Sequence, residues 1–597
     1  MTTNADIVGS EHRKFEENLE KIETLSRRLV DVLAHRKPIN SALNGPDPIL
    51  YAEAAQAYWQ EWINNPAKVF EQQVEHWGKS LGHFMEAQQA LASGRLTPPE
   101  DTGPSDKRFR NPLWDSHPYF NFIKQQYLIN AGAIRASVDE IDGMDPLEKR
   151  RLRFFAQQIT DLMAPTNFFA TNPDALQKAV ETEGDSLVKG LENLVADLEA
   201  NHGELVVRLV DEEAFEVGRN IATAKGKVVY RNRMMELIQY SPTTDKVHET
   251  PLVIFPPWIN KFYILDLKKQ NSLIQYLVDE GYTIFMVSWV NADESYRDVG
   301  LEDYIEEGYL TAMRIVRETC GVERLNVVGY CIAGTTLALT LSLLKKRGDK
   351  QVKSATFFTA LTDFSDQGEF VPFLQNDFVD GIEAEIAETG ILKSFIMSRT
   401  FSYLRSTDLI YTPAIRSYMM GETPPAFDLL YWNGDGANLP GKMTMQYLRQ
   451  LCQNNEFSEG RFELMGETLD LADVDVPLIS ITAETDHIAA WKDCYRGVQK
   501  MGSRSKTFVL SESGHIAGIV NPPSKKKYGH YLNPDLSLPV EQWQSDGDFH
   551  QGSWWPFWTG WLHKRSGKKI DARQPGDSDL EPLCDAPGTY VLVKANQ

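Results

Sequence analysis

Residues 325–344 read LNVVGYCIAGTTLALTLSLL. A run of this length without a charged residue could span a membrane, but its composition changes partway along. The first part, LNVVG, is typical of a buried strand, residues 330–334 suit a tight turn, and TTLALTLSLL is compatible with a helix. The stretch therefore predicts a strand, a turn and a helix of a parallel sheet, and not a membrane span.

The turn in this stretch has the pattern of a nucleophile elbow, with Cys331 as the reactive residue. Such a turn is so sharp that the positions two before and two after the nucleophile must be small. Gly329 and Ala333 occupy them, and Gly334 follows. The elbow would place the cysteine at a helix N-terminus, where the dipole and free N–H groups favour a thiolate. Taken alone, the motif also fits a buried structural cysteine.

Short apolar runs from about residue 223 onward predict the rest of the sheet. Helical stretches separate several of these runs, which indicates parallel strands joined by right-handed crossovers. The expected strands are 252–256, 283–287, 325–329, 354–358, 477–482 and 506–510. The fold class is therefore α/β, with a mostly parallel sheet.

Two polar residues follow the last two predicted strands and complete a candidate catalytic triad. Asp486 comes just after strand 477–482, and His515 comes after strand 506–510. In this fold the chain order is nucleophile, acid and then histidine, as it is for Cys331, Asp486 and His515. His487, next to the acid, is expected to be a structural or channel-wall residue.

Two backbone N–H groups are expected to form the oxyanion hole. One belongs to Ile332, directly after the nucleophile, and the other comes from the loop after an early strand. In that loop residues 256–257 are prolines and have no N–H to donate. Ile259 is the preferred second donor, with Trp258 and Asn260 as alternatives.

The chain is expected to divide into a helical N-terminal domain, residues 1–222, and a catalytic domain, residues 223–597. Within the first, 67–91 is a predicted helix and 93–112, with four prolines, a flexible linker. Residues 362–472 are too long for a crossover and are interpreted as a cap inserted over the carboxyl edge of the sheet. Aromatic cap residues that could keep water from the site are Phe401, Tyr403, Tyr431 and Trp432.

Composition narrows the class of protein. Of 597 residues, 42% are hydrophobic and 24% charged, as in globular proteins, and the net charge of −22 argues against a nucleic-acid binder. Five cysteines without a CxxC pair indicate reduced thiols and neither a disulfide framework nor a metal site. The polar N-terminus has no secretory pattern. A soluble, cytoplasmic protein without a membrane span is expected.

Long motifs in order along the chain resemble the polyhydroxyalkanoate synthases, in particular the single-polypeptide class I type. They span about residue 108 to 562, some three quarters of the chain. The segments are FRNPLWDSHPYFNFIKQQYLI, FEVGRNIATAKGKVVYRN, PPWINKFYILDL, MVSWVNAD, GYCIAGT, FDLLYWNGDGANLP, DHIAAW, SGHIAGIVNPP and GSWWPFWTGWL.

The resemblance implies an enzyme with the α/β-hydrolase fold that polymerises (R)-3-hydroxyacyl-CoA, foremost 3-hydroxybutyryl-CoA, through a cysteine nucleophile. It also implies an active homodimer and polyester granules in the cytoplasm, with granule-associated proteins as partners. No cofactor is implied, because coenzyme A is part of the substrate and a product. The family's triad falls on Cys331, Asp486 and His515. Ala333 and Ala490 depart from the family's usual glycine and proline, and neither removes a functional group.

Two other functions remain open at this point. The same scaffold could serve a cysteine-dependent acyl-CoA thioesterase or lipase-like hydrolase, or a non-catalytic granule-associated protein. The intact triad argues against the second. If coenzyme A binds, local cations must offset the negative charge of the protein, and the candidates are Lys261, Lys268, Lys269, Lys525, Lys526 and Lys527.

Overall fold

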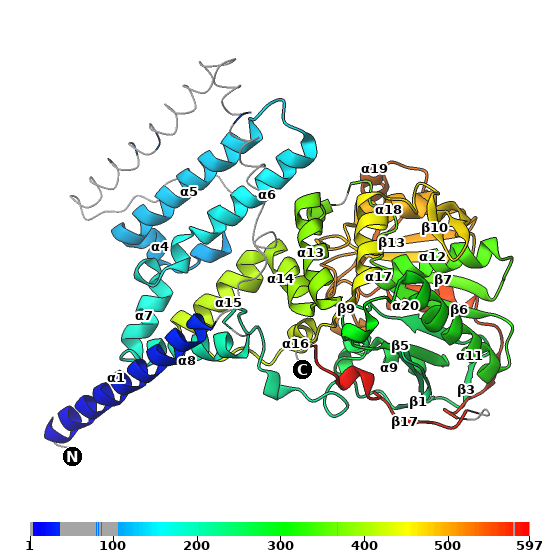
Figure 1. The fold of residues 1–597 in the computed structure, drawn as a ribbon, viewed down its shortest axis with the longest axis horizontal. Coiled ribbons are helices and arrows are strands. Elements are labelled where there is room, and N and C mark those ends of the chain that lie inside the picture. The colour runs from blue at the N-terminus through cyan, green and yellow to red at the C-terminus, as the bar shows by residue number, and fades with distance from the viewer. Residues whose placement is uncertain are drawn as a thin grey trace. The chain divides into compact units, whose positions relative to one another are not determined.

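The computed structural model describes residues 4–35, 56, 79, 82, 85, 106–201, 203–366, 368–576 and 580–595. These residues form two compact units (Figure 1). Unit 1 comprises residues 1–210 and 401–425, and unit 2 comprises 211–400 and 426–597. The predicted helix 67–91 and most of the predicted linker lie outside the described residues.

Unit 2 is built on an eleven-stranded sheet with the order β15-β14-β13-β12-β7-β6-β4-β5-β2-β1-β17. Its strands are β1 (Gly226–Arg231), β2 (Met235–Tyr240), β4 (Leu252–Phe255), β5 (Ile284–Trp289), β6 (Leu325–Tyr330), β7 (Val352–Phe358), β12 (Leu478–Ala483), β13 (Lys506–Ser511), β14 (His530–Leu532), β15 (Asp548–His550) and β17 (Cys584–Asp585). Short pairs join β3 (Lys246–His248) to β16 (Lys569–Asp571), β8 (Ile391–Leu392) to β9 (Leu439–Pro440), and β10 (Phe462–Leu464) to β11 (Glu467–Leu469).

The strands predicted from apolar runs form the centre of this sheet. From β5 through β4, β6, β7 and β12 to β13 all neighbours pair in parallel, so the prediction is confirmed. The antiparallel strands at both margins were not predicted. At one margin β14 and β15 are three residues each, too short to give a periodic signal.

Helices surround the sheet of unit 2 (Figure 1). Buried tryptophans of α20 pack on the sheet, and Trp558 donates from its indole to Thr356 Oγ1 of β7 at 3.0 Å. The helices are α9 (Leu273–Asp279), α10 (Leu301–Asp303), α11 (Thr311–Cys320), α12 (Ile332–Lys346), α13 (Asn376–Thr389), α14 (Ser394–Leu404, which continues into unit 1), α16 (Asp428–Gly434), α17 (Gly441–Met445), α18 (Trp491–Lys500), α19 (Val540–Ser545) and α20 (Trp555–His563).

Unit 1 is helical, as the sequence predicts for this part of the chain. An aromatic cluster of Phe109, Trp114, Phe120 and Tyr127 forms one of its cores. Phe109 lies in the turn Lys107–Phe109 and is buried, so this end of the predicted flexible linker is structured. The helices are α1 (Asn4–Ala34), α4 (Leu113–Ser116), α5 (Pro118–Asp139), α6 (Pro146–Leu162), α7 (Pro173–Glu181), α8 (Asp185–Ala200) and α15 (Thr412–Ala414).

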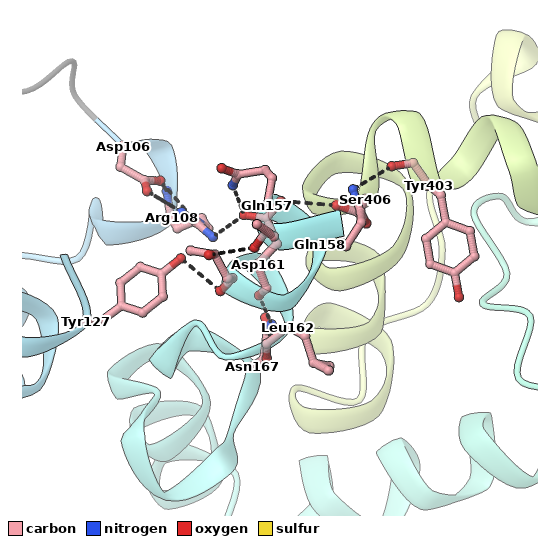
Figure 2. Close-up of polar contacts among 12 residues, drawn as sticks. Asp106, Arg108, Tyr127, Gln157, Gln158, Asp161, Leu162, Asn167, Tyr403 and Ser406 are labelled. Carbon is pink, nitrogen blue, oxygen red and sulfur yellow. Dashed lines mark hydrogen bonds and ion pairs between the residues drawn. The ribbon is translucent and has the colours of Figure 1, made fainter. Parts of the chain in front are cut away.

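Residues 401–425, which the sequence assigns to the cap, belong instead to unit 1. Figure 2 shows one reason: the buried carboxylate of Asp161, on α6, accepts hydrogen bonds from Arg108 (3.1 Å) and from Ser406 (3.3 Å). A second reason is close packing on α8, where a Cβ at Gly190 would lie only 2.0 Å from the carbonyl oxygen of Tyr418. A cap drawn as one continuous insertion misses this exchange, because nothing in the local sequence reports a partner more than 200 residues away.

Membrane-spanning helices were sought along the described ranges. None of the helices there is both long and apolar enough to cross a bilayer.

Candidate active site

Cys331 occupies a sharp turn between β6 and α12. Its backbone has φ 55° and ψ −127°, a conformation that residues other than glycine rarely adopt. Its N–H donates to the carbonyl oxygen of Phe358 on β7, at 2.7 Å, and its side chain is 9% exposed. The predicted strand, turn and helix are therefore confirmed, with the cysteine at the N-terminus of the helix.

Gly329 and Gly334 make this turn possible because the strand and the helix touch there. A Cβ on Gly329 would lie 2.7 Å from the Gly334 Cα, and one on Gly334 would lie 2.4 Å from the Cβ of Ala360. Ala333 is fully buried, and its carbonyl oxygen accepts a hydrogen bond from the Tyr309 hydroxyl at 2.7 Å. The closest approach thus falls on Gly334, one position later than the elbow pattern suggests.

A Gly334→Ala substitution is expected to cost about 1–3 kcal/mol of stability and to displace Cys331. We expect at least a tenfold loss of activity, measured by CoA release together with thermal unfolding. The added Ala360→Gly change removes the 2.4 Å contact and should restore part of the loss. Ala333→Gly is the matched control and should cost only about 1 kcal/mol, the price of a glycine in a helix. Wild-type stability and activity in Gly334→Ala would contradict this account of the turn.

His515 and Asp486 lie together after β13 and β12. Asp486 Oδ2 is 2.7 Å from His515 Nδ1, and both side chains are buried. The other carboxylate oxygen, Oδ1, accepts the backbone N–H groups of Ile488 and Ala489 at 2.8 and 2.9 Å. These bonds fix the carboxylate, which in turn orients the imidazole.

The electrostatic surroundings of His515 differ from those of an ordinary histidine. Burial lowers the pKa of the imidazole, but the charges and hydrogen bonds of Asp486 and Cys331 outweigh it and raise this pKa to about 10. The raised pKa favours the positively charged form of His515 beside Cys331. The same histidine contacts Tyr330, whose hydroxyl donates to the His515 carbonyl oxygen at 3.3 Å.

The two predicted oxyanion donors lie on neighbouring segments. Phe255, at the end of β4, pairs with Gly329 of β6, so the loop that carries Ile259 leaves the sheet beside the elbow. The indole of Trp258, in the same loop, donates to Thr336 Oγ1 of α12 at 3.3 Å. Among the described residues, neither the N–H of Ile259 nor that of Ile332 donates a hydrogen bond.

Tyr447, in the π-helix η13 (Gln446–Gln453), lies close enough to Cys331 to interact with it electrostatically, and no sequence pattern pointed to it. Burial and then the charges of Cys452 and Cys331 raise the pKa of its hydroxyl well above the ordinary value, so the group stays protonated. Its ring packs edge-on against Trp258, 5.7 Å between centroids. Tyr447 follows no predicted strand and belongs to no motif, which is why only the fold reveals it.

The cap residues named from the sequence have varied surroundings. Tyr431 and Trp432, on α16, are buried, and the Trp432 indole donates to the Lys261 carbonyl oxygen at 2.6 Å. His487 is half-buried. Phe401 and Tyr403 lie in the part of α14 that belongs to unit 1.

The lysines proposed to bind coenzyme A differ in their exposure to solvent. Lys261 is buried and donates from Nζ to the Val593 carbonyl oxygen at 2.7 Å, so it is not available to a phosphate, and that expectation is wrong. Lys268 lies over the Phe215 ring at 5.1 Å. Lys269 and residues 525–527 are exposed. Within the described ranges no three His, Cys, Asp or Glu side chains gather as metal ligands would.

Comparison with known proteins gives matches along most of the chain. Residues 105–277 match the family described as "Poly-beta-hydroxybutyrate polymerase (PhaC) N-terminus", and residues 250–522 match the α/β hydrolase fold. A poly(3-hydroxyalkanoate) polymerase of Methylorubrum extorquens is 39% identical over 538 residues, which cover 90% of this chain and 89% of the relative. The PhaC subunit of the Cupriavidus necator polymerase is 39% identical over 515 residues, 85% of this chain and 86% of the relative.

Among solved structures, a soluble variant of the monoglyceride lipase from Saccharomyces cerevisiae is similar over 59% of this chain and 99% of its own. Its sequence identity is 11% and its TM-score 0.34. The extent and identity of the sequence matches decide the family, and the hydrolase match agrees with the observed sheet. The chain therefore belongs to the poly(3-hydroxyalkanoate) polymerase (PhaC) family and is an acyltransferase with the α/β-hydrolase fold.

Proposed function

We propose that the protein polymerises (R)-3-hydroxyacyl-CoA, foremost (R)-3-hydroxybutyryl-CoA, and releases CoA, with Cys331 as the nucleophile. The observation that carries the proposal is the juxtaposition at the sheet edge: a cysteine in a strained elbow lies beside a histidine whose pKa is raised and which a buried carboxylate orients. The matched family description names polyhydroxybutyrate, which supports the four-carbon substrate.

In the first step the Cys331 sulfur attacks the carbonyl carbon of the incoming thioester. The carbonyl oxygen becomes an oxyanion and accepts the N–H groups of Ile332 and Ile259. The bond to the CoA sulfur then breaks, and His515 gives its proton to the departing thiolate. Because one thioester replaces another, the acyl group stays activated on Cys331, which a serine ester would not achieve.

In the elongation step the 3-hydroxyl of an acyl unit or of the chain end attacks an acyl thioester. The new ester bond forms as a carbon–sulfur bond breaks, and the hydroxyl proton must be removed. We assign this proton to His515, because both oxygens of Asp486 already accept hydrogen bonds. Asp486 then orients the imidazole and offsets its charge.

The surroundings of the site suit a reaction from which water is excluded. We propose that parts of residues 362–472 act as a cap, supported by the buried aromatic side chains of α16 and by Tyr447. The exposed lysines 525–527, in the loop that follows His515, are proposed to meet the phosphates of coenzyme A. An active homodimer and polyester granules in the cytoplasm belong to the same proposal, supported by family membership.

One experiment divides polymerase from thioesterase. Purified protein is incubated with (R)-3-hydroxybutyryl-CoA, and free CoA, free 3-hydroxybutyrate and sedimentable polyester are quantified together. We expect polyester to account for nearly all of the CoA released, since the acyl group passes to another hydroxyl and not to water. Free acid equal to the released CoA, without polymer, would reject the proposed function.

A further inference from the structure

Residues 584–592 run along the sheet of unit 2 and are fastened to its antiparallel margin. The fully buried carboxylate of Glu236, on β2, accepts the backbone N–H groups of Thr589 and Tyr590 at 2.9 and 3.0 Å. The Tyr590 hydroxyl donates to the Asn232 carbonyl oxygen at 2.7 Å. These bonds fix the backbone directly before residues 593–595.

The tail segment, residues 593–595, then reaches the loops around the candidate active site. The Val593 carbonyl oxygen accepts the ammonium group of Lys261 at 2.7 Å, and that of Ala595 accepts the side-chain amide of Asn438 at 3.1 Å. In Figure 1 this part of the chain, drawn in red, lies beside α16 and β9. The tail segment thus bonds to the loop after β4 and to the end of the α16 region.

Lys594 adds a charged contact to these bonds. Its ammonium group lies 3.2 Å from Asp435 Oδ1, and the side chain of Asp435 is almost fully buried. Burial lowers the pKa of Lys594, but the charge of Asp435 outweighs it and leaves this pKa raised. Tyr263, just beyond the loop, donates from its hydroxyl to Asp435 Oδ2 at 2.6 Å. The Lys594 side chain is 43% exposed and that of Asp435 2%, so loss of the lysine would leave a buried carboxylate without its ion-pair partner.

Residues 432–437 also form hydrogen bonds with the loop at residues 259–261. The Ile259 carbonyl oxygen accepts the Ala437 N–H at 2.9 Å, and the Lys261 carbonyl oxygen accepts the Trp432 indole. Asn260 donates from its side chain to the Trp432 carbonyl oxygen at 3.3 Å. Every residue of the loop is thereby bonded, while the Ile259 N–H is left without an acceptor in the described chain.

We propose that the tail segment is a positioning element, which locks residues 259–261 against residues 428–438 and so aims the Ile259 N–H at the oxyanion. This inference rests on the proposed function, because it assumes an acyl transfer in which an oxyanion develops. Lys261 of the loop bonds to Val593 of the tail, and Asp435 contacts both Lys594 of the tail and Tyr263, just beyond the loop. Loss of the tail contacts would leave the loop free to shift, and a shift of about 1 Å in a catalytic group can cost a hundredfold in rate.

The test compares two reactions of Cys331, of which only one forms an oxyanion. Acylation is followed as single-turnover CoA release from (R)-3-hydroxybutyryl-CoA, and alkylation as inactivation by iodoacetamide, a displacement at carbon without an oxyanion. Lys594→Ala and a chain ending at Leu592 are expected to slow acylation about tenfold to a hundredfold and to leave alkylation within about twofold. Lys594→Arg should restore acylation, since it keeps the ion pair with Asp435.

Lys246→Ala is the matched control, because Lys246 pairs with Asp571 on the surface of the β3–β16 pair, and it should change neither rate. Wild-type acylation in both tail variants would overturn the proposal, as would a parallel fall of acylation and alkylation, which would indicate a general disturbance of the site. Failure of the proposed function is detected by a separate measurement on the wild-type protein. If Cys331 is not the nucleophile, wild-type protein alkylated at Cys331 will still release CoA.

Discussion

A Cys331→Ala variant is expected to release no measurable CoA from (R)-3-hydroxybutyryl-CoA and to unfold at the wild-type temperature. The substitution removes the sulfur that would carry the acyl group, and loss of a nucleophile costs about 10⁶-fold in rate in a well-studied triad enzyme. The side chain is small and 9% exposed, so little packing is lost. Single-turnover CoA release and thermal unfolding measured on the same preparation separate the two effects.

Cys331→Ser should also be slower by orders of magnitude, because an alcohol is far less acidic than a thiol. Cys320→Ala is the matched control: Cys320 is a free thiol at the end of α11, outside the candidate site. Activity near the wild-type level in Cys331→Ala would exclude this residue as the nucleophile.

His515→Gln is expected to abolish acylation, with a loss of up to about 10⁴-fold in single-turnover CoA release. Glutamine can fill the space and hydrogen-bond, but it can neither hold a proton beside Cys331 nor pass one to the leaving CoA. Because the pKa of His515 is raised to about 10, the wild-type imidazole is charged below that pH. Alkylation of Cys331 at pH 7 should therefore slow in His515→Gln as well.

Asp486→Asn distinguishes orientation from proton transfer. It removes the charge that raises the pKa of His515, so the imidazole loses its proton at lower pH. We expect partial acylation and a pH profile of acylation in which the activity that depends on the charged imidazole is lost at lower pH. An Asp486→Asn enzyme with full acylation, full polymer formation and an unchanged profile would mean that the acid lies elsewhere.

The placement of the three candidate triad residues could be anticipated because each of them is tied to a strand end that the sequence marks. An apolar run followed by a polar residue locates Cys331, Asp486 and His515, and parallel strands bring such ends to one edge. In the structure, Nδ1 of His515 lies 2.7 Å from Oδ2 of Asp486, and Cys331 occupies the sharp turn that was expected. The family resemblance is confirmed by relatives that span most of the chain.

Other features depend on contacts that local patterns do not encode. Tyr447, in a π-helix of the insertion, interacts electrostatically with Cys331 although the two lie far apart in the sequence. Lys261 was a candidate for coenzyme A binding from the sequence, yet its ammonium group is buried against the Val593 carbonyl oxygen more than 300 residues later. The critical glycine of the elbow is Gly334, since the distance to Ala360 on the next strand's loop decides which position must lack a Cβ.

Because unit 1 is assembled from two distant parts of the chain, it cannot be removed or exchanged as one continuous segment. If residues 1–210 were removed, the remaining chain would retain residues 401–425. It would lack the Asp161 carboxylate and the α8 surface against which these residues pack. The helical region is therefore not a detachable appendage, and a swap between relatives must carry both pieces together. The same contacts restrict evolution: substitutions at Gly190 or Asp161 can persist only together with compatible residues near Tyr418 and Ser406.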